Sequence, residues 1–158
     1  MKVARYSTLV VALVFSGFAL AQTAQRKSAT PVSDRERLIG AWRLVSMEEQ
    51  GADGKMHRIT DRKGTLIYTR DGRTAVQIMF PNPETAPSTD YAQGGYEASF
   101  GTYEVNEEAH TLTRYVEGSV TRGLVGKHLT RAYQFIDGRL ISRSIRPDEH
   151  WSVTWEHY

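Results

Sequence analysis

Arg114 is the residue of this sequence best suited to hold a small charged group. It shares one face of the segment 110–116 with Leu112 and Val116, and we expect this segment to pair with 100–106. The predicted inner face of this pair carries Tyr103, Val105, Leu112, Arg114 and Val116. A guanidinium enclosed by a sheet must be hydrogen-bonded or paired, so it could bind a carboxylate, enolate or phenolate of a ligand. The alternative is a structural arginine whose N–H groups are satisfied by Tyr103 and backbone carbonyls.

Proton transfer is the other chemistry that this part of the chain could support. Tyr103 and Glu104 are its two titratable candidates, whereas the adjacent carboxylates Glu107 and Glu108 are expected in a solvated turn. The sequence has no Gly-x-Ser-x-Gly elbow, no glycine-rich loop that opens a helix and no cysteine nucleophile. Tyr103 and Glu104 are therefore only weak catalytic candidates.

The five histidines do not have the spacing of metal ligands. They stand at positions 57, 110, 128, 150 and 157, and no two of them lie two or four residues apart beside a third ligand. We therefore expect no metal centre and no cofactor. A single histidine such as His157 could hold haem inside a barrel, although a histidine at a strand end is more often structural.

Aromatic residues at alternate positions are typical of a ligand cavity or of a filled core. A two-residue turn at Asp137-Gly138 would pair Phe135 with Leu140 and place Arg131 and Tyr133 on the same inner face. In the last strand, Trp151 and Trp155 alternate with polar residues, so one face there is interior.

The segment 64–80 does not decide between two inner faces. One carries Leu66, Tyr68, Gln77 and Met79, and the other carries Ile67, Val76 and Ile78. We favour the first face because its mixture of aromatic and polar side chains suits a cavity wall. The predicted ligand-binding residues are then Tyr68, Gln77, Met79, Tyr103, Arg114, Arg131, Tyr133, Phe135, Trp151 and Trp155.

Short strands separated by turns must position these residues. Dipeptides that favour two-residue hairpins occur at 53–54, 71–72 and 137–138, and Ser33-x-x-Glu36 forms a capping box that would begin a short helix over 34–39. The long connection 81–95 contains three prolines and is either a lid or a plain surface loop. The predicted strands are 41–48, 55–60, 64–70, 73–80, 96–106, 110–118, 128–136, 139–146 and 151–157.

Eight or nine short strands with tight links predict an all-β fold, an antiparallel up-and-down β-barrel with a short N-terminal helix. Barrels of about eight strands are filled by their own side chains or hold one small ligand. Gly40-Ala41-Trp42 lies where the helix meets the first strand. A glycine there lets the helix pass close to the strand, and the indole can plug the end of the barrel.

Four segments, LIGAWRLVS, GTLIYTRDGR, FGTYEVNEEAHTLTRYVEGS and WSVTWEH, resemble the bacterial and fungal lipocalin-like domain proteins. The resemblance covers about residues 36–157 and implies a lipocalin-like barrel. Gly40-x-Trp42 is similar to the signature of lipocalins, whose tryptophan packs at the closed end of the barrel. Lipocalins also carry an arginine on the last strand that stacks on this tryptophan, but here Glu156 and His157 stand in that region.

Two further features of the family do not carry over. Related members have two histidines where this chain has Arg114-Tyr115, so a role built on those histidines is not implied. Thr89-Asp90-Tyr91 spells the lipocalin turn motif, but it comes too early in the chain, and we interpret it as a coincidence.

The first residues predict an exported protein. Lys2 and Arg5 precede an apolar stretch, and Ala19-Leu20-Ala21 offers a cleavage site before Gln22. The predicted organisation is a signal peptide over 1–21, a disordered leader over 22–32 and a lipocalin-like barrel domain over 33–158. A membrane anchor is the less favoured alternative, because the apolar stretch is shorter than the roughly 20 residues that a spanning helix needs.

Cleavage after Ala21 would remove two of the 20 basic residues and none of the 18 acidic ones, so the mature charges balance. We therefore expect a secreted or periplasmic monomer that does not bind nucleic acid or anionic membranes. Two functions remain open. The first is binding of a small hydrophobic or aromatic molecule, with an acidic group held by Arg114. The second is a cofactor-free isomerase or cyclase in the same cavity, which an inward-facing carboxylate or histidine would favour.

Overall fold

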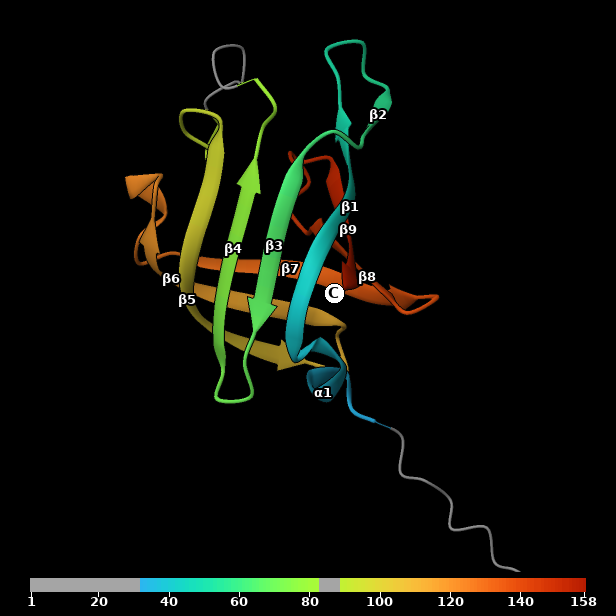
Figure 1. The fold of residues 1–158 in the computed structure, drawn as a ribbon, viewed down its shortest axis with the longest axis vertical. Helices are drawn as coiled ribbons and strands as arrows, with labels where there is room; N and C mark the ends of the chain where they lie inside the picture. The colour runs from blue at the N-terminus through green and yellow to red at the C-terminus, as the bar shows by residue number, and fades with distance from the viewer. Residues whose placement is uncertain (1–31, 83–88) are drawn as a thin grey trace, which may run out of the picture. The chain divides into compact units, whose positions relative to one another are not determined.

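The computed structural model of this protein describes residues 32–82 and 89–158 (Figure 1). The predicted signal peptide and residues 22–31 of the predicted leader lie outside the described residues, as do residues 83–88 of the long connection. Nothing in the described residues therefore tests the prediction of a cleaved signal.

The described residues form one short α-helix and nine strands, which confirms every predicted strand to within two residues at each end. A short 3-10 helix, η1 (Arg122–Leu124), was not expected. The other elements are α1 (Asp34–Leu38), β1 (Gly40–Gln50), β2 (Met56–Ile59), β3 (Lys63–Tyr68), β4 (Arg73–Met79), β5 (Tyr96–Asn106), β6 (Thr111–Ser119), β7 (His128–Ile136), β8 (Arg139–Ser144) and β9 (Trp151–His157).

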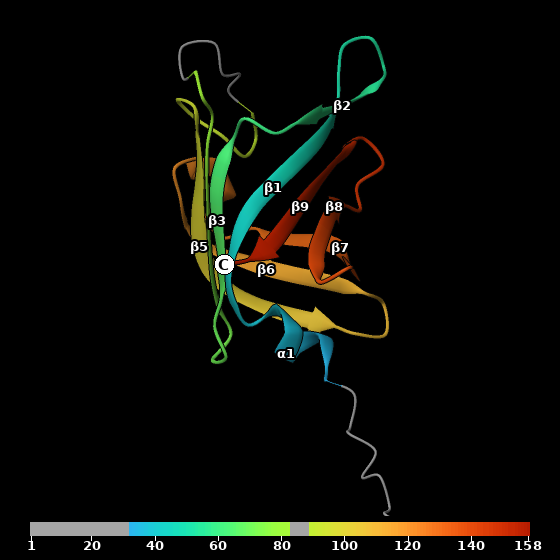
Figure 2. The ribbon, with the colours of Figure 1, turned by 45° about the vertical axis from the view of Figure 1, so that its right-hand side comes forward.

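The sheet closes on itself as an eight-stranded antiparallel barrel, which Figure 2 shows from the side where β1 and β9 meet. Strands β3 to β9 follow one another in chain order, and β1 pairs with both β3 and β9. Strand β2 is an addition that pairs only with the last residues of β1. This up-and-down order confirms the predicted barrel over a sandwich.

Helix α1 lies across one end of the barrel and closes it (Figure 2). Its N-terminus is capped as the sequence predicts, because the Ser33 hydroxyl accepts a hydrogen bond from the Glu36 backbone N–H at 3.1 Å. The Trp42 side chain is 1% exposed, and its indole N–H donates to the Leu38 carbonyl at 2.8 Å. Helix and first strand are therefore joined through the indole.

Position 40 requires glycine because of its backbone conformation and the nearby His157 ring, and not only because the helix passes close to the strand. Gly40 has a φ of +135°, and a Cβ there would lie 2.8 Å from the His157 ring. The His157 ring stacks on the Trp42 indole with centroids 3.5 Å apart. His157 thus occupies, in this chain, the place that the resemblance assigns to an arginine.

The predicted inner face of β3 and β4 is half wrong, because the turn between them is longer than assumed. Tyr68 pairs with Thr74, and the Thr69 N–H donates to the Arg73 carbonyl at 2.9 Å, so the loop between the paired residues has three members, 70–72. Gly72 in this loop has a positive φ of +87°. A one-residue slip moves every side chain of a strand to the other face. The inner face therefore combines Leu66 and Tyr68 with Thr74, Val76 and Ile78.

The other predicted faces are confirmed by the register. Tyr103 stands opposite Arg114 across β5 and β6, and Phe135 stands opposite Leu140 across β7 and β8. The core formed by these faces is mostly aliphatic and aromatic, with Leu38, Trp42, Leu140 and Val116 as its most completely buried large side chains.

Candidate functional site

A cavity of about 460 Å³ occupies the barrel interior, between the α1 end and the opposite mouth. This volume lies in the range of small-molecule sites. Leu38 forms part of its lining near the closed end, and Tyr91 and Arg62 form part of it near the mouth. Most of the remaining wall is apolar and comes from Met47, Leu66, Val76, Ile78, Phe80, Leu112, Leu124, Leu129, Leu140 and Val153.

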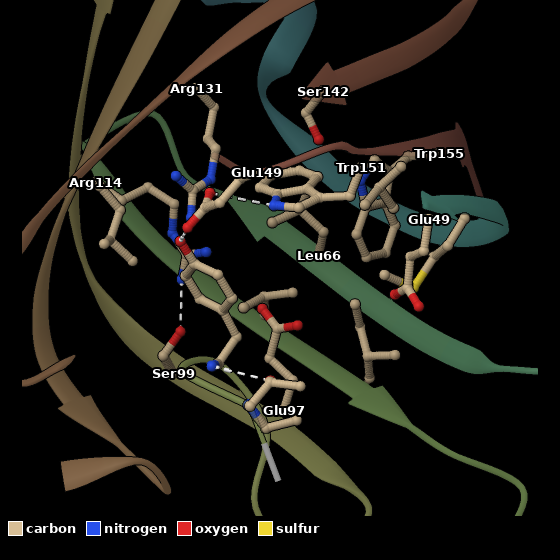
Figure 3. Close-up of a pocket in the computed structure, with 18 of the residues that line it drawn as sticks. Glu49, Leu66, Glu97, Ser99, Arg114, Arg131, Ser142, Glu149, Trp151 and Trp155 are labelled. Atoms are coloured by element: carbon tan, nitrogen blue, oxygen red, sulfur yellow. Dashed lines mark hydrogen bonds between the residues drawn. The ribbon is translucent and has the colours of Figure 1, made fainter. Parts of the chain in front are cut away.

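Arg114 reaches this cavity from β6 and is poorly satisfied there (Figure 3). Its one hydrogen bond among the described residues runs from Nη2 to the Ser99 hydroxyl, at 2.8 Å. The buried Nε atom has no partner among these residues. Burial lowers the pKa of Arg114. A guanidinium has five N–H donors, so most of its hydrogen-bonding capacity remains available to a ligand.

Glu97 is a cavity residue that the sequence analysis missed. It lies on β5 two residues before Ser99, and Figure 3 shows both on the same wall of the cavity as Arg114. No hydrogen bond or ion pair joins its carboxyl group to another described residue. Burial raises its pKa, an effect that the positive charges of Arg114, Arg131 and Arg62 only partly offset.

The alternation along β5 could have found Glu97. Stepping back from Tyr103 by two residues at a time reaches positions 101, 99 and 97, and all three are on the inner face. The inner face was predicted only for residues 100–106 of this strand, which leaves Glu97 out.

Two other acidic residues of the cavity already have partners. Glu49 binds the Arg62 guanidinium through both oxygens, at 2.5 and 3.0 Å, and the same guanidinium lies 4.0 Å from the centre of the Phe80 ring. Glu149 accepts hydrogen bonds from the Tyr91 hydroxyl at 2.7 Å and from the Ser144 hydroxyl at 2.5 Å. Asp148 pairs with Arg146, and Asp90 is exposed, so Glu97 is a more enclosed carboxylate with no partner among the described residues.

The sequence matches the family of lipocalin-like domains over residues 39–157. The chain belongs to the lipocalin-like domain family. Among curated proteins, none matches this lipocalin-like protein.

Two solved structures are similar to this chain at low sequence identity. One is a lipocalin-like protein from Bacteroides uniformis, at 13% identity and a TM-score of 0.48, with 77% of this chain and 99% of that chain covered. Another is an uncharacterized protein from Bacteroides eggerthii, at 13% identity and a TM-score of 0.46 over the same shares.

Six of the ten predicted ligand-binding residues line the cavity of this lipocalin-like protein. Two of them, Arg131 and Trp151, come together at the mouth, where the Arg131 guanidinium lies 4.7 Å from the Trp151 ring centre and 5.0 Å from that of Tyr91. The six are Tyr68, Arg114, Arg131, Tyr133, Trp151 and Trp155.

Two predicted residues face inward but lie outside the cavity, near the closed end. The Tyr103 hydroxyl donates to the Thr69 carbonyl at 2.9 Å, so it does not satisfy Arg114 as the structural alternative supposed. Phe135 packs near Trp42, with its ring centre 3.8 Å from the Arg37 guanidinium.

Three predicted residues lie on the outer surface. Gln77 and Met79 are exposed on β4 because of the three-residue turn described above, and their assignment to the inner face was wrong. Glu104, one of the two weak catalytic candidates, is exposed on the outer face of β5. Neither Tyr103 nor Glu104 lines the cavity, so neither is placed to move a proton within it.

The Thr89-Asp90-Tyr91 segment lines the mouth of the cavity rather than forming a terminal turn motif. Its contact with Glu149 links the long connection to the loop between β8 and β9. Within residues 32–82 and 89–158, no cluster of three metal-ligating side chains occurs. The same residues contain no helix with the length and apolar character to cross a membrane.

Proposed function

We propose that this protein binds one small, largely apolar or aromatic molecule whose acidic group is held by Arg114. The observation that carries the proposal is a buried guanidinium that makes one hydrogen bond and faces a cavity of about 460 Å³. A buried charge without a partner is costly, and a carboxylate, phenolate or sulfonate on the ligand would supply that partner.

The remaining wall fits an aromatic or aliphatic body. Trp151, Trp155 and Leu66 line the cavity, and Figure 3 shows their labels on the side away from Arg114. The Tyr68 phenol also lines the cavity, and burial raises its pKa to about 12, so it remains a neutral hydrogen-bond donor. Apolar walls with a few convergent polar groups are the general form of small-molecule sites.

Substitution of Arg114 by methionine tests the proposal. The probes are 8-anilinonaphthalene-1-sulfonate, an aromatic anion, and N-phenyl-1-naphthylamine, which has the same rings without the sulfonate. Arg114→Met should weaken binding of the sulfonate by about 1.5 to 3 kcal/mol, roughly ten- to hundredfold. Binding of the neutral amine should change little, since methionine keeps the apolar stem of the side chain.

Arg143→Met is the matched control, because Arg143 is exposed on the outer face of β8. It removes the same charge from the protein without changing the cavity. Melting temperature and titration calorimetry on both variants separate a ligand anchor from a structural arginine. An unchanged sulfonate affinity together with a lower melting temperature in Arg114→Met would refute the proposal.

Glu97 gives specific support to a second candidate, a cofactor-free isomerase or cyclase in the same cavity. Proton transfer needs a titratable group inside the site, and Glu97 is such a group, in place of Tyr103 and Glu104. Native mass spectrometry of protein taken from its source would identify a co-purifying molecule. A single unchanged ligand would favour binding, and a pair of isomers would favour the enzyme.

We also infer that the protein acts after export, on the sequence of residues 1–21 alone. Sequencing the N-terminus of the mature protein tests this inference. A chain that begins at Gln22 is expected, and one that retains residues 1–21 would contradict it.

A further inference from the structure

We propose that Glu97 takes up a proton when an anionic ligand binds to Arg114, so that the cavity selects organic acids and binds them more tightly as the pH falls. The inference rests on the proposed function, because it concerns the same site and the same ligand group. It adds Glu97 as a second group that contacts the ligand's acidic group, and pH as the condition that controls binding.

The starting observation is that two opposite charges share a cavity wall without pairing. Glu97 and Arg114 come from neighbouring strands, β5 and β6, yet no contact within 4 Å joins the carboxylate to a guanidinium of the described chain. Arg114 is instead turned to the Ser99 hydroxyl. The free carboxylate and the under-used guanidinium therefore both remain available to a ligand.

An anion placed against Arg114 would face the Glu97 carboxylate in the same enclosed space. Two negative charges that share a site of low dielectric repel strongly, and one of them becomes protonated. Protonated Glu97 then acts as a donor and can give a hydrogen bond to the ligand's acidic group. Burial already raises the pKa of Glu97, so the proton is added to a group that favours it.

Four charged groups act on Glu97, and the cavity is also lined by Asp90, Asp148, Glu149 and His150. Arg114 on β6, Arg131 on β7 and Arg62 before β3 act on it as positive charges, and Glu49 on β1 acts as a negative one. Arg62 and Glu49 neutralise each other in a two-point ion pair, and Arg131 lies against two aromatic rings. Binding of an anion at Arg114 cancels the positive charge that acts most strongly on Glu97 and pushes the pKa of Glu97 further up.

The direction of the pH effect follows because the pKa of Glu97 is higher in the ligand-bound protein than in the free protein. The bound state holds the Glu97 proton more tightly than the free state, so lowering the pH favours the bound state. Affinity for an anion should rise as the pH falls through the range between the free and bound pKa values, by at most about tenfold per pH unit for one proton. A ligand without a charge should show no such dependence.

The test titrates wild type and Glu97→Gln with 8-anilinonaphthalene-1-sulfonate by calorimetry from pH 5.5 to 8.5. The sulfonate stays ionised throughout, so the probe does not contribute to the pH dependence. Wild type should bind more tightly as the pH falls. Glu97→Gln should bind with a constant affinity, above that of wild type at high pH and close to it at low pH. N-phenyl-1-naphthylamine should bind both proteins independently of pH.

Glu104→Gln is the matched control, since it makes the same change on the outer face of the same strand. It should follow wild type at every pH. Repeating the titrations in buffers of different ionisation enthalpy counts the protons directly. Wild type should take up a fraction of a proton per sulfonate bound, and Glu97→Gln none. The number of protons that wild type takes up tests the proposal even if Glu97→Gln is less stable.

The outcomes separate this inference from the proposed function. If sulfonate binding to wild type takes up no proton, or if Glu97→Gln keeps the pH dependence, the role of Glu97 is refuted while an affinity loss in Arg114→Met still upholds the anchor. If Arg114→Met binds the sulfonate as wild type does, the proposed function fails whatever the pH series shows.

Discussion

At the closed end of the barrel, polar groups on aromatic residues are hydrogen-bonded to the backbone, whereas in the cavity Arg114 makes one hydrogen bond and Glu97 makes none to the described residues. The Trp42 indole donates to Leu38, and the Tyr103 hydroxyl donates to Thr69. Arg114 and Glu97 are similarly enclosed, but their groups face open volume. Burial alone therefore does not distinguish a structural residue from a ligand-binding one. The completeness of hydrogen bonding does.

An arginine also lies against aromatic rings at each end of the barrel, and the two arginines contact different parts of the chain. Arg37 covers Phe135 on the outside of a packed core. Arg131 lies against the rings of Tyr91, in the long connection, and of Trp151, the first residue of β9. The Arg37 contact lies on one packed core. The Arg131 contact joins the long connection to the start of β9, two segments whose separation would admit a ligand.

Loss of Trp42 should have the largest effect on the fold. Trp42→Ala leaves a void beneath α1 and frees the Leu38 carbonyl, so the free energy of unfolding should fall by about 3 to 5 kcal/mol. Urea denaturation measures this. The ratio of sulfonate to amine affinity should stay near that of wild type under conditions where the variant is folded, since Arg114 is untouched. A change in that ratio would show that the two ends are not independent.

A smaller loss is expected at His157. His157→Ala removes a ring stacked on the indole, a contact worth about 0.5 to 1.5 kcal/mol beyond the area it buries. His128→Ala is the control, because the His128 ring meets the exposed Tyr115 ring, whereas the His157 ring meets the buried Trp42 indole. Thermal unfolding should lower the melting temperature more for His157→Ala than for His128→Ala. Equal shifts would show that the stacked ring does not stabilise the closed end.

The strands and most of their faces could be predicted because they depend on local patterns. The alternation along 100–106 and 110–116 and the turn at 137–138 gave the correct neighbours, Tyr103 with Arg114 and Phe135 with Leu140. Asp71-Gly72 failed as a guide because the same dipeptide also fits a three-residue loop. The difference of one residue moved Gln77 and Met79 to the outer face.

The candidate site was harder to predict than the barrel, for two physical reasons. Glu97 follows the alternation of its strand, but a carboxylate on an inner face contradicts the expectation that inner positions are apolar. The contact between Tyr91 and Glu149 joins residues 58 positions apart, in two loops without periodicity. Only the closure of the barrel brings such loops to one mouth.

The smallest expected effect concerns that mouth. Tyr91→Phe removes the hydroxyl that donates to Glu149 but keeps the ring beside Arg131. Because the pair is partly exposed, the free energy of unfolding should fall by only about 0.5 to 1.5 kcal/mol. If the contact holds the mouth closed, association and dissociation of the neutral amine should both become faster, while its affinity changes little. Stopped-flow fluorescence measures both rates.

Tyr96→Phe, on the exposed outer face, is the control and should leave both rates unchanged. Unchanged rates in Tyr91→Phe would mean that ligands enter by another path, and the contrast between a fixed closed end and an opening mouth would fail there.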